Sequence, residues 1–356
     1  MSIRHTSRQD EIGRVWLKAM GSVTVIVVRI VLNIIRSSLK HYANLIAIAF
    51  CLVLLLFLCL ESFADQKLIA IVKTEDFSSY TRALKGVKQV INQSQAGADF
   101  LEFTIPEEAA QRDSVLGEIK KRRPELIVTI GSKATDLVSR AIKEIPIVFS
   151  AVLNPVISGF VSTGEAPEGN LTGASLDVPL RIQLEKFKLI VPHLKSVGVL
   201  YTPETEPLIR QARSVSEDLG IKLVALSIES EKEIPSVLER LRDEVDGIWA
   251  VADPTIFTPQ STQFILLYTL RNGLPLMGLT PSFVQAGALF TLAPDYKDVG
   301  RQAGEMALEI ISGKDPKHIS ISVPRMIYLY LNLKTANQIN LKVSPDLVQV
   351  AKEVFE

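Results

Sequence analysis

The stretch Ile145–Asp177, IPIVFSAVLNPVISGFVSTGEAPEGNLTGASLD, separates two similar halves of the chain. It begins with the apolar run Ile145–Phe149, whose length and lack of polar alternation predict a buried strand. From Ser150 onward, prolines, glycines and small polar residues replace any regular pattern. Loops of that length inside a compact domain are usually functional. The stretch therefore predicts either a surface loop or a crossover that lines a ligand site between two lobes.

Strands alternate with helices on both sides of this stretch, which is the pattern of parallel sheets covered on both faces. The strands expected before it are 67–73, 100–105 and 125–130, with helices after Ser78, after Pro106 and over 132–142. The elements expected after it are a helix over 179–190, strands over 197–201, 221–228, 247–251 and 274–279, and helices over 206–219, 232–242 and 259–272. We therefore predict an α/β fold of two doubly wound parallel-sheet lobes joined by a hinge.

The last part of the chain is expected to complete both lobes. A helix over 295–312, an extended segment over 319–332 and a closing helix over 347–355 follow the second run of strands. We expect lobe 1 to span 65–175 and to be completed by about 287–320. We expect lobe 2 to span 176–286 and to be completed by about 321–356.

An uncharged apolar segment, Ala43–Leu60, precedes the first lobe. It follows a basic flank and is followed by small residues at Ser62 and Ala64, which predicts a signal peptide cleaved after Ala64. The run is also long enough for a retained inner-membrane anchor, preceded by a basic extension with a second apolar stretch at Val23–Ile35. Either alternative predicts a periplasmic or extracytoplasmic protein that contacts the membrane only through residues 1–64.

Composition excludes several classes of function. Lysines plus arginines equal aspartates plus glutamates at 39 each, so nothing in the charge favours a nucleic-acid partner. Both cysteines, Cys51 and Cys59, lie in the apolar segment, so the lobes have neither a cysteine nucleophile nor a cysteine zinc site. The histidines do not have metal-ligand spacing. We predict neither a metal nor a cofactor.

Candidate binding residues follow from the rule that ligands sit at the carboxyl ends of parallel strands. Ser132 and Lys133 begin a helix whose N-terminal N–H groups could hold an anion or simply need a cap. Asp253 could be a turn residue or the counter-charge of a ligand ammonium group. Aromatic rings in the same loops could enclose an apolar ligand group or pack in the core. The predicted ligand-binding residues are Phe77, Tyr80, Ser132, Lys133, Ser150, Asn154, Asp253, Thr255, Thr280 and Ser282.

These side chains suit binding better than catalysis. They are mostly hydroxyls and amides, and no acid, base and nucleophile stand in catalytic register. The least implausible catalytic set is Ser132, Lys133 and Asp253, which would have to meet within hydrogen-bond distance in one cleft. We therefore predict a binding protein with no catalytic residues.

Several segments resemble the ABC transporter substrate-binding family related to tryptophan-binding periplasmic proteins. They are Pro124–Val128, Ile145–Val152, Asn154–Pro155, Gly169–Gly173, Val197–Tyr201, Gly300–Ala303 and Ile310–Pro316. The resemblance implies the type I periplasmic binding fold, in which two lobes joined by a three-strand hinge close on a small ligand. It matches Ser132, Ser150, Asp253, Thr255 and Thr280 to polar cleft positions, whereas Asn154 stands where the family usually has an aspartate.

The export segment, the paired lobes and this resemblance together predict an extracytoplasmic solute-binding protein of an ABC transporter. We expect it to bind a small polar ligand, an amino acid or a similar molecule, between the lobes by hinge closure and to deliver it to ABC permease subunits. The alternative is a membrane-anchored sensory module that signals ligand binding to a partner protein.

Overall fold

The computed structural model describes residues 26–36, 67–94, 97–160 and 169–356. The chain divides into two compact units, Met1–Asp65 and Gln66–Glu356. In the first unit, residues 26–36 form a helix whose side chains are exposed. The expected signal peptide or anchor at Ala43–Leu60 and the cleavage point after Ala64 lie outside the described residues. Within the described ranges, no helix combines the length and apolar character needed to cross a bilayer.

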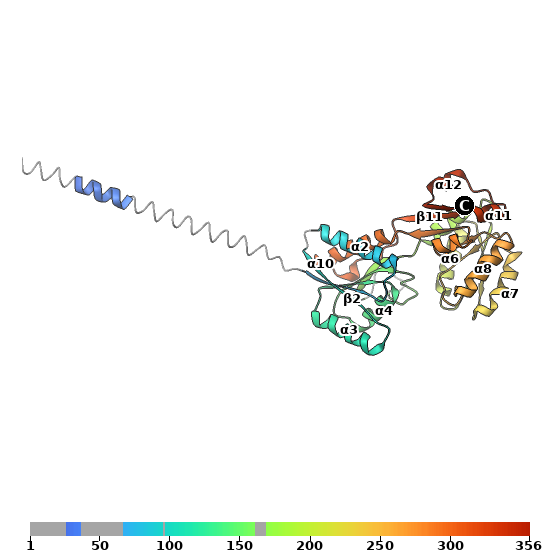
Figure 1. Cartoon of the computed structure of the whole chain (residues 1–356), viewed down its shortest axis with the longest axis horizontal. Helices are drawn as coiled ribbons and strands as arrows, with labels where there is room; N and C mark the ends of the chain where they lie inside the picture. Colours follow the sequence, from blue (N-terminus) through green and yellow to red (C-terminus); the bar gives the residue numbers. More distant parts are fainter. Residues whose placement is uncertain (1–25, 37–66, 95–96, 161–168) are drawn as a thin grey trace, which may run out of the picture. The chain divides into compact units, whose positions relative to one another are not determined.

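The second unit contains two sheets, each with its own helices (Figure 1). The first sheet is parallel throughout and has the strand order β2-β1-β3-β4-β5. Its central strands are almost entirely buried, because helices cover both faces, and this explains their continuous apolar sequence. The strands are β1 (Lys67–Lys73), β2 (Ala98–Thr104), β3 (Leu126–Ile130), β4 (Ile147–Val152) and β5 (Leu171–Ser175).

The helices of the first sheet include one from much later in the chain. They are α2 (Ser78–Gln93), α3 (Ala109–Arg122), α4 (Ser132–Ala141) and α10 (Tyr296–Ile311). Helices α2 and α10 lie side by side over one face of the sheet and share an apolar core with it (Figure 1). Their backbones approach closely at Gly86 and Gly300, where a Cβ atom would collide with the opposite helix backbone.

The second sheet has the order β12-β11-β10-β9-β8-β6-β7. Strands β7, β6, β8, β9 and β10 run parallel, whereas β11 pairs antiparallel to β10 and parallel to β12. The strands are β6 (Ser196–Tyr201), β7 (Lys222–Ser227), β8 (Ile248–Trp249), β9 (Leu276–Met277), β10 (Phe290–Pro294), β11 (Ile327–Asn332) and β12 (Glu353–Phe355).

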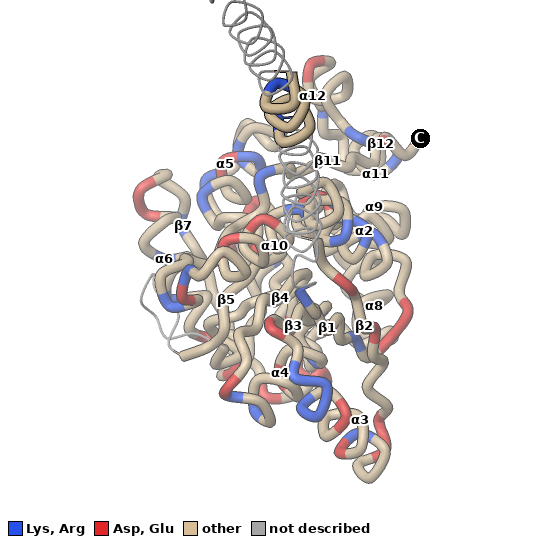
Figure 2. The backbone as a smooth tube through the Cα atoms, turned by 90° about the vertical axis from the view of Figure 1, so that its left-hand side faces the viewer, with Lys and Arg blue, Asp and Glu red and all other residues tan. Residues whose placement is uncertain are grey.

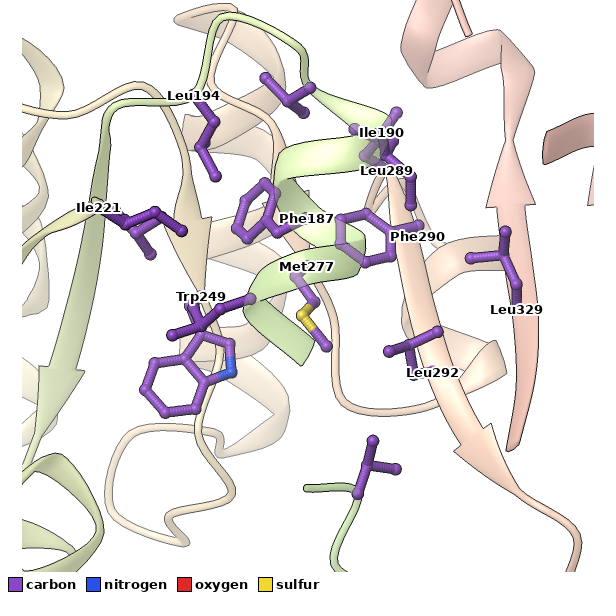
Figure 3. Close-up of a cluster of buried hydrophobic side chains, with 14 of the residues drawn as sticks. Phe187, Ile190, Leu194, Ile221, Trp249, Met277, Leu289, Phe290, Leu292 and Leu329 are labelled. Atoms are coloured by element: carbon purple, nitrogen blue, oxygen red, sulfur yellow. The ribbon is translucent and has the colours of Figure 1, made fainter. Parts of the chain in front are cut away.

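The helices of the second sheet enclose a core that is rich in aromatic residues. Phe187 and Phe290 meet edge to face with their ring centroids 5.2 Å apart, next to Met277 and Trp249 (Figure 3). The helices are α5 (Leu180–Ile190), α6 (Glu206–Asp218), α7 (Ile234–Arg242), α8 (Pro259–Arg271), α9 (Pro281–Gln285), α11 (Leu333–Gln338) and α12 (Pro345–Val350), and the 3-10 turns are η1 (Glu231–Glu233) and η2 (Pro316–His318).

The predicted α/β architecture of two parallel-sheet lobes is confirmed, and the structure differs from the sequence prediction in three local details. Leu171–Ser175, in the part of the connecting stretch expected to be irregular, forms β5 of the first sheet. Phe290–Pro294, for which no strand was predicted, forms β10. The closing helix ends at Val350 and is followed by β12, because Lys352 donates its backbone N–H to Leu329 on the edge strand β11.

The chain passes between the two sheets three times: after β5, between β10 and α10, and between η2 and β11. Asp295 joins the last two passages. Its Oδ1 accepts the N–H groups of Lys297 and Asp298 at the start of α10, and its Oδ2 accepts the hydroxyl of Tyr328 on β11 at 3.1 Å. We propose that the second passage lies at Asp295 rather than near residue 287, since β10 belongs to the second sheet.

Charged residues of both signs are interspersed along the helices of the second unit (Figure 2). Many form exposed pairs within one helix, such as Arg122 with Glu118 and Arg140 with Asp136. Exposed pairs of this kind contribute little to stability, so the buried cores described above hold the fold.

Candidate functional site

A cleft of about 410 Å³ lies where strand ends of both sheets meet the first passage between them. This volume is in the range of small-molecule binding sites. Its lining combines apolar side chains with a few polar ones. The lining residues are Leu153, Asn154, Leu176, Asp177, Val178, Pro179, Leu180, Gln183, Leu208, Gln211, Trp249, Ala250, Val251, Ala252, Met277, Gly278, Leu279, Thr280, Leu292, Pro294 and Tyr296.

The floor of the cleft is apolar and comes from the second sheet. Trp249 ends β8, Met277 ends β9, and Leu292 lies on β10. Their side chains lie along one side of the Phe187–Phe290 pair (Figure 3). Because neighbouring parallel strands end at one edge of a sheet, three separated sequence segments form a single surface. Such a floor suits an apolar or aromatic group of a ligand.

Asp177 is the acidic group of this cleft and lies on the first passage, directly after β5. Its Oδ1 accepts the backbone N–H of Asn154 at 2.8 Å, and its backbone N–H donates to the hydroxyl of Ser175. Burial is the largest effect on this group and raises the pKa of its carboxyl above the ordinary value. A partly buried carboxylate beside an apolar floor is suited to hold a ligand cation.

The edge of the first sheet supplies a helix N-terminus close to this cleft. Gly131 has φ 88°, and α4 begins after it without a side-chain cap. The hydroxyl of Ser132 accepts the backbone N–H of Leu153, a cleft residue, at 3.4 Å. The free N–H groups of a helix N-terminus favour an anion such as a carboxylate.

Three of the predicted residues, Tyr80, Phe77 and Ser150, lie around this turn. The ring of Tyr80 covers Gly131 so closely that a Cβ atom there would lie 2.5 Å from the tyrosine Cζ. Burial raises the pKa of Tyr80, and Phe77 meets its ring edge to face at 5.4 Å. The hydroxyl of Ser150 is fully buried and has no hydrogen-bond partner among the described residues. Buried hydroxyls without partners are uncommon and often mark functional sites.

Backbone strain occurs where β4 enters the cleft. Ala151 has φ 59° and Asn154 has φ 51°, a conformation that residues other than glycine seldom adopt. The pairing of β4 with β5 also shifts between Ser150 and Val152. Strained conformations persist only where the surrounding structure holds them in place, and they are found most often at ligand-binding segments.

The carboxylate of Asp253 is satisfied by hydrogen bonds from residues of the second lobe. Its Oδ2 accepts the hydroxyls of Thr202 at 2.6 Å and Thr205 at 2.9 Å, and its Oδ1 accepts the backbone N–H of Thr255 at 3.0 Å. The aspartate is 3% exposed and does not line the cleft. Thr280 does line the cleft, and its hydroxyl donates to Ser282, which lies outside the lining.

The predicted ligand-binding residues thus lie in different parts of the second unit, and only two of them line the cleft. Asn154 and Thr280 line the cleft, whereas Lys133 is exposed and pairs with Glu107 at 2.6 Å. Ser132, Lys133 and Asp253 form hydrogen bonds with Leu153, Glu107 and Thr202 and not with one another, so these three form no catalytic set. Across the residues that the structure describes, no three His, Cys, Asp or Glu side chains are grouped to hold a metal ion.

Sequence reasoning missed Asp177, Gln183 and Trp249, which the structure brings together at the cleft. Asp177 ends the connecting stretch and could have been found from its place directly before the helix of the second lobe. Trp249 stands at the end of an expected strand, where the strand-end rule points. Gln183 had no signal, since it lies inside a helix.

Two α/β lobes with a cleft at their facing strand ends define a two-lobed small-molecule binding protein. The chain belongs to the family of ABC transporter substrate binding proteins, whose model matches residues 69–355. Members of this family bind and deliver solutes rather than catalyse reactions, and the prediction of a non-enzymatic protein is therefore confirmed.

Individual relatives agree with this assignment. The chain is 26% identical over 297 residues to a tyrosine-binding protein of Clostridioides difficile (strain R20291), covering 81% of this chain and 85% of the relative. Among solved structures, it is similar to a ligand-free, open substrate-binding protein with adhesive properties from Clostridium difficile, with TM-score 0.67, 21% identity, and coverage of 81% of this chain and 99% of the other.

A second similar structure is an ABC domain from Streptococcus pneumonia in complex with L-Trp, with TM-score 0.60 and 20% identity, covering 82% of this chain and 100% of the other. At this identity, the likeness to the solved structures establishes the fold. It confirms two α/β lobes of the type I periplasmic binding kind.

Proposed function

We propose that this protein is the extracytoplasmic substrate-binding component of an ABC transporter and that its ligand is an L-amino acid with an apolar or aromatic side chain. Asp177 binds the ligand amino group, and the floor of Trp249, Met277 and Leu292 receives the ligand side chain. The single observation that carries this proposal is the partly buried carboxylate of Asp177 beside that apolar floor. The tyrosine and L-Trp named for the relatives are ligands with both features.

The ligand carboxylate binds at the N-terminus of α4 in this proposal. The support is chemical: free N–H groups, the adjacent Ser132 hydroxyl and the unpartnered Ser150 hydroxyl all favour an anion. Asp253, whose carboxylate already has three partners, has a structural role in lobe 2. In this proposal Asp177, and not Asp253, binds the ligand ammonium group. The turn at the start of α4, with Ser132, keeps the anion-binding role that the sequence predicts.

Ligand binding closes the lobes about the three passages between the sheets. Closure requires that the ligand bind the closed form more tightly than the open form. The positive φ angles of Ala151 and Asn154 support a ligand-contacting role for this edge of the first lobe. Closure would bring the α4 turn towards the cleft that Asp177 and Trp249 line.

Residues 1–64 direct the protein across the inner membrane, by a signal peptide cleaved after Ala64 or by a retained anchor, and the closed form delivers its ligand to ABC permease subunits. Family membership favours this transport role over the sensory alternative.

Titration calorimetry with a panel of L-amino acids tests the proposal, with D-amino acids, purines and sugars as controls. We expect one L-amino acid with an apolar or aromatic side chain to bind with one-to-one stoichiometry and to reduce the radius of gyration in small-angle scattering. A sugar or purine that binds while no amino acid does would refute the ligand class. Binding without any change in the scattering curve would refute closure.

A further inference from the structure

Gln183 on α5 connects two parts of the cleft that sequence places far apart. Its side-chain Oε1 accepts the indole N–H of Trp249 at 2.8 Å, and its Nε2 donates to the backbone carbonyl of Val178 at 2.7 Å. The oxygen faces a donor and the nitrogen faces an acceptor, so the two contacts allow only one orientation of the amide. All three residues line the cleft.

The two contacts hold the ligand-binding groups of the proposed function at a set separation. Trp249 is the part of the floor on which a ligand side chain rests, and Val178 directly follows Asp177, the proposed partner of the ligand amino group. Trp249 and Val178 are both buried, at 2% and 8% exposure. The indole N–H would be left without a partner if the Gln183 amide were removed, which is costly in a buried place.

We propose that Gln183 is a specificity-determining positioning residue of the cleft. It fixes the indole of Trp249 relative to the backbone beside Asp177, and so sets the length and width of the ligand side chain that fits between them. This inference rests on the proposed function, since it assumes that Asp177 and Trp249 bind opposite ends of one ligand. It goes further by naming a residue that affects the ligand only through Trp249 and the backbone beside Asp177, and that supplies neither the charge nor the apolar surface itself.

Gln183→Met tests this role, because methionine retains the length of the side chain and removes both hydrogen bonds. Gln263→Met is the matched control: Gln263 lies on α8 outside the cleft lining, is exposed, and has no side-chain hydrogen bond to the described residues. The full chain is used with Trp16→Phe, so that Trp249 is the only tryptophan and its emission reports on the indole directly.

We expect Gln183→Met to shift the Trp249 emission maximum and to weaken binding of the preferred large L-amino acid by about tenfold. The ratio of affinities for large and small apolar amino acids should fall, whereas Gln263→Met should change both affinities by less than about twofold. In a Trp249→Phe background, which has no indole N–H, Gln183→Met should have little further effect on affinity, since contacting residues couple in double-mutant cycles.

An unchanged affinity ratio and emission spectrum in Gln183→Met would overturn the inference, as would an equal loss of affinity in Gln263→Met. If Gln183→Met does not fold, Gln183→Glu takes its place, because its carboxylate still accepts the indole N–H but cannot donate to the carbonyl of Val178. A lower affinity ratio than in the wild type then supports the positioning role, and an unchanged ratio contradicts it. If the wild-type chain binds no amino acid, the proposed function fails; if it binds and Gln183→Met binds identically, only the role of Gln183 fails.

Discussion

The close approach of α2 and α10 supplies a test of the fold that does not depend on the ligand. At Gly300 an added Cβ atom would lie 2.7 Å from the carbonyl carbon of Ala83 and 2.9 Å from its Cα. Carbon atoms prefer separations of about 3.5–4.0 Å, so the helices would have to move apart by roughly 1 Å. The obstacle is helix backbone, which cannot rotate away as a side chain can.

Gly300→Ala should therefore destabilise the protein by about 2 kcal/mol. Overpacking costs roughly 1–3 kcal/mol, and the contact with helix backbone puts this site at the upper end of that range. Replacing glycine by alanine gains about 1 kcal/mol of helix propensity, which leaves a net cost of about 2 kcal/mol. For a unit of this size, each kcal/mol shifts the unfolding midpoint by about 1.5–2 °C. We expect the unfolding midpoint of the ligand-free protein, followed by circular dichroism, to fall by about 3–4 °C.

Gly117→Ala is the matched control, because Gly117 lies inside α3 and a Cβ atom there meets nothing within 4 Å. The same substitution should raise the midpoint by about 2 °C, since only the helix-propensity gain of roughly 0.5–1 kcal/mol applies. If both variants shift the midpoint in the same direction and by the same amount, the account of α2–α10 packing is refuted.

Two further substitutions distinguish the roles of Asp177 and Asp253. Burial raises the pKa of Asp177, so the folded state holds this proton more tightly than the unfolded chain. The resulting stabilisation is complete below the ordinary carboxyl pKa of about 3.9 and is lost as pH rises through the folded pKa. Asp177→Asn should therefore raise the midpoint of the ligand-free protein at pH 7 and leave it unchanged near pH 3, as measured by thermal unfolding at both values; a lower midpoint at pH 7 would contradict the burial argument. Asp253→Ala removes the acceptor of three hydrogen bonds and should cost about 2 kcal/mol in urea unfolding while changing ligand affinity by less than about threefold; a loss of affinity without a loss of stability would return Asp253 to the ligand site.

The alternating α/β pattern could be predicted because buried parallel strands read as continuous apolar runs and their helices carry an apolar face. Strand β5 escaped prediction since its sequence, LTGAS, has small residues in place of bulky ones. The structure supplies the reason: a Cβ atom at Gly173 would lie 2.5 Å from the Cγ of Phe149, so only glycine allows the two strands to pair there.

The candidate site was less predictable, because its contacts join residues that are distant in sequence. The rule of strand ends pointed to Asn154 and Thr280, which line the cleft. It also pointed to Asp253, but no sequence pattern reveals that two threonines about 50 residues earlier would satisfy that carboxylate. The sequence assigns no role to Asp177, since its burial and its bond to the N–H of Asn154 depend on how β4 and β5 pair.

Calorimetric titration of the wild type and Asp177→Asn with the preferred L-amino acid tests the central claim most directly. Loss of a charge-assisted contact to the ligand ammonium group costs about 1.5–3 kcal/mol, so affinity should fall by roughly 10- to 150-fold in Asp177→Asn. Asp253→Ala, measured in the same experiment, should bind almost as the wild type does. If Asp177→Asn instead binds the amino acid with unchanged affinity, Asp177 is not the partner of the ligand amino group and the proposed site is wrong.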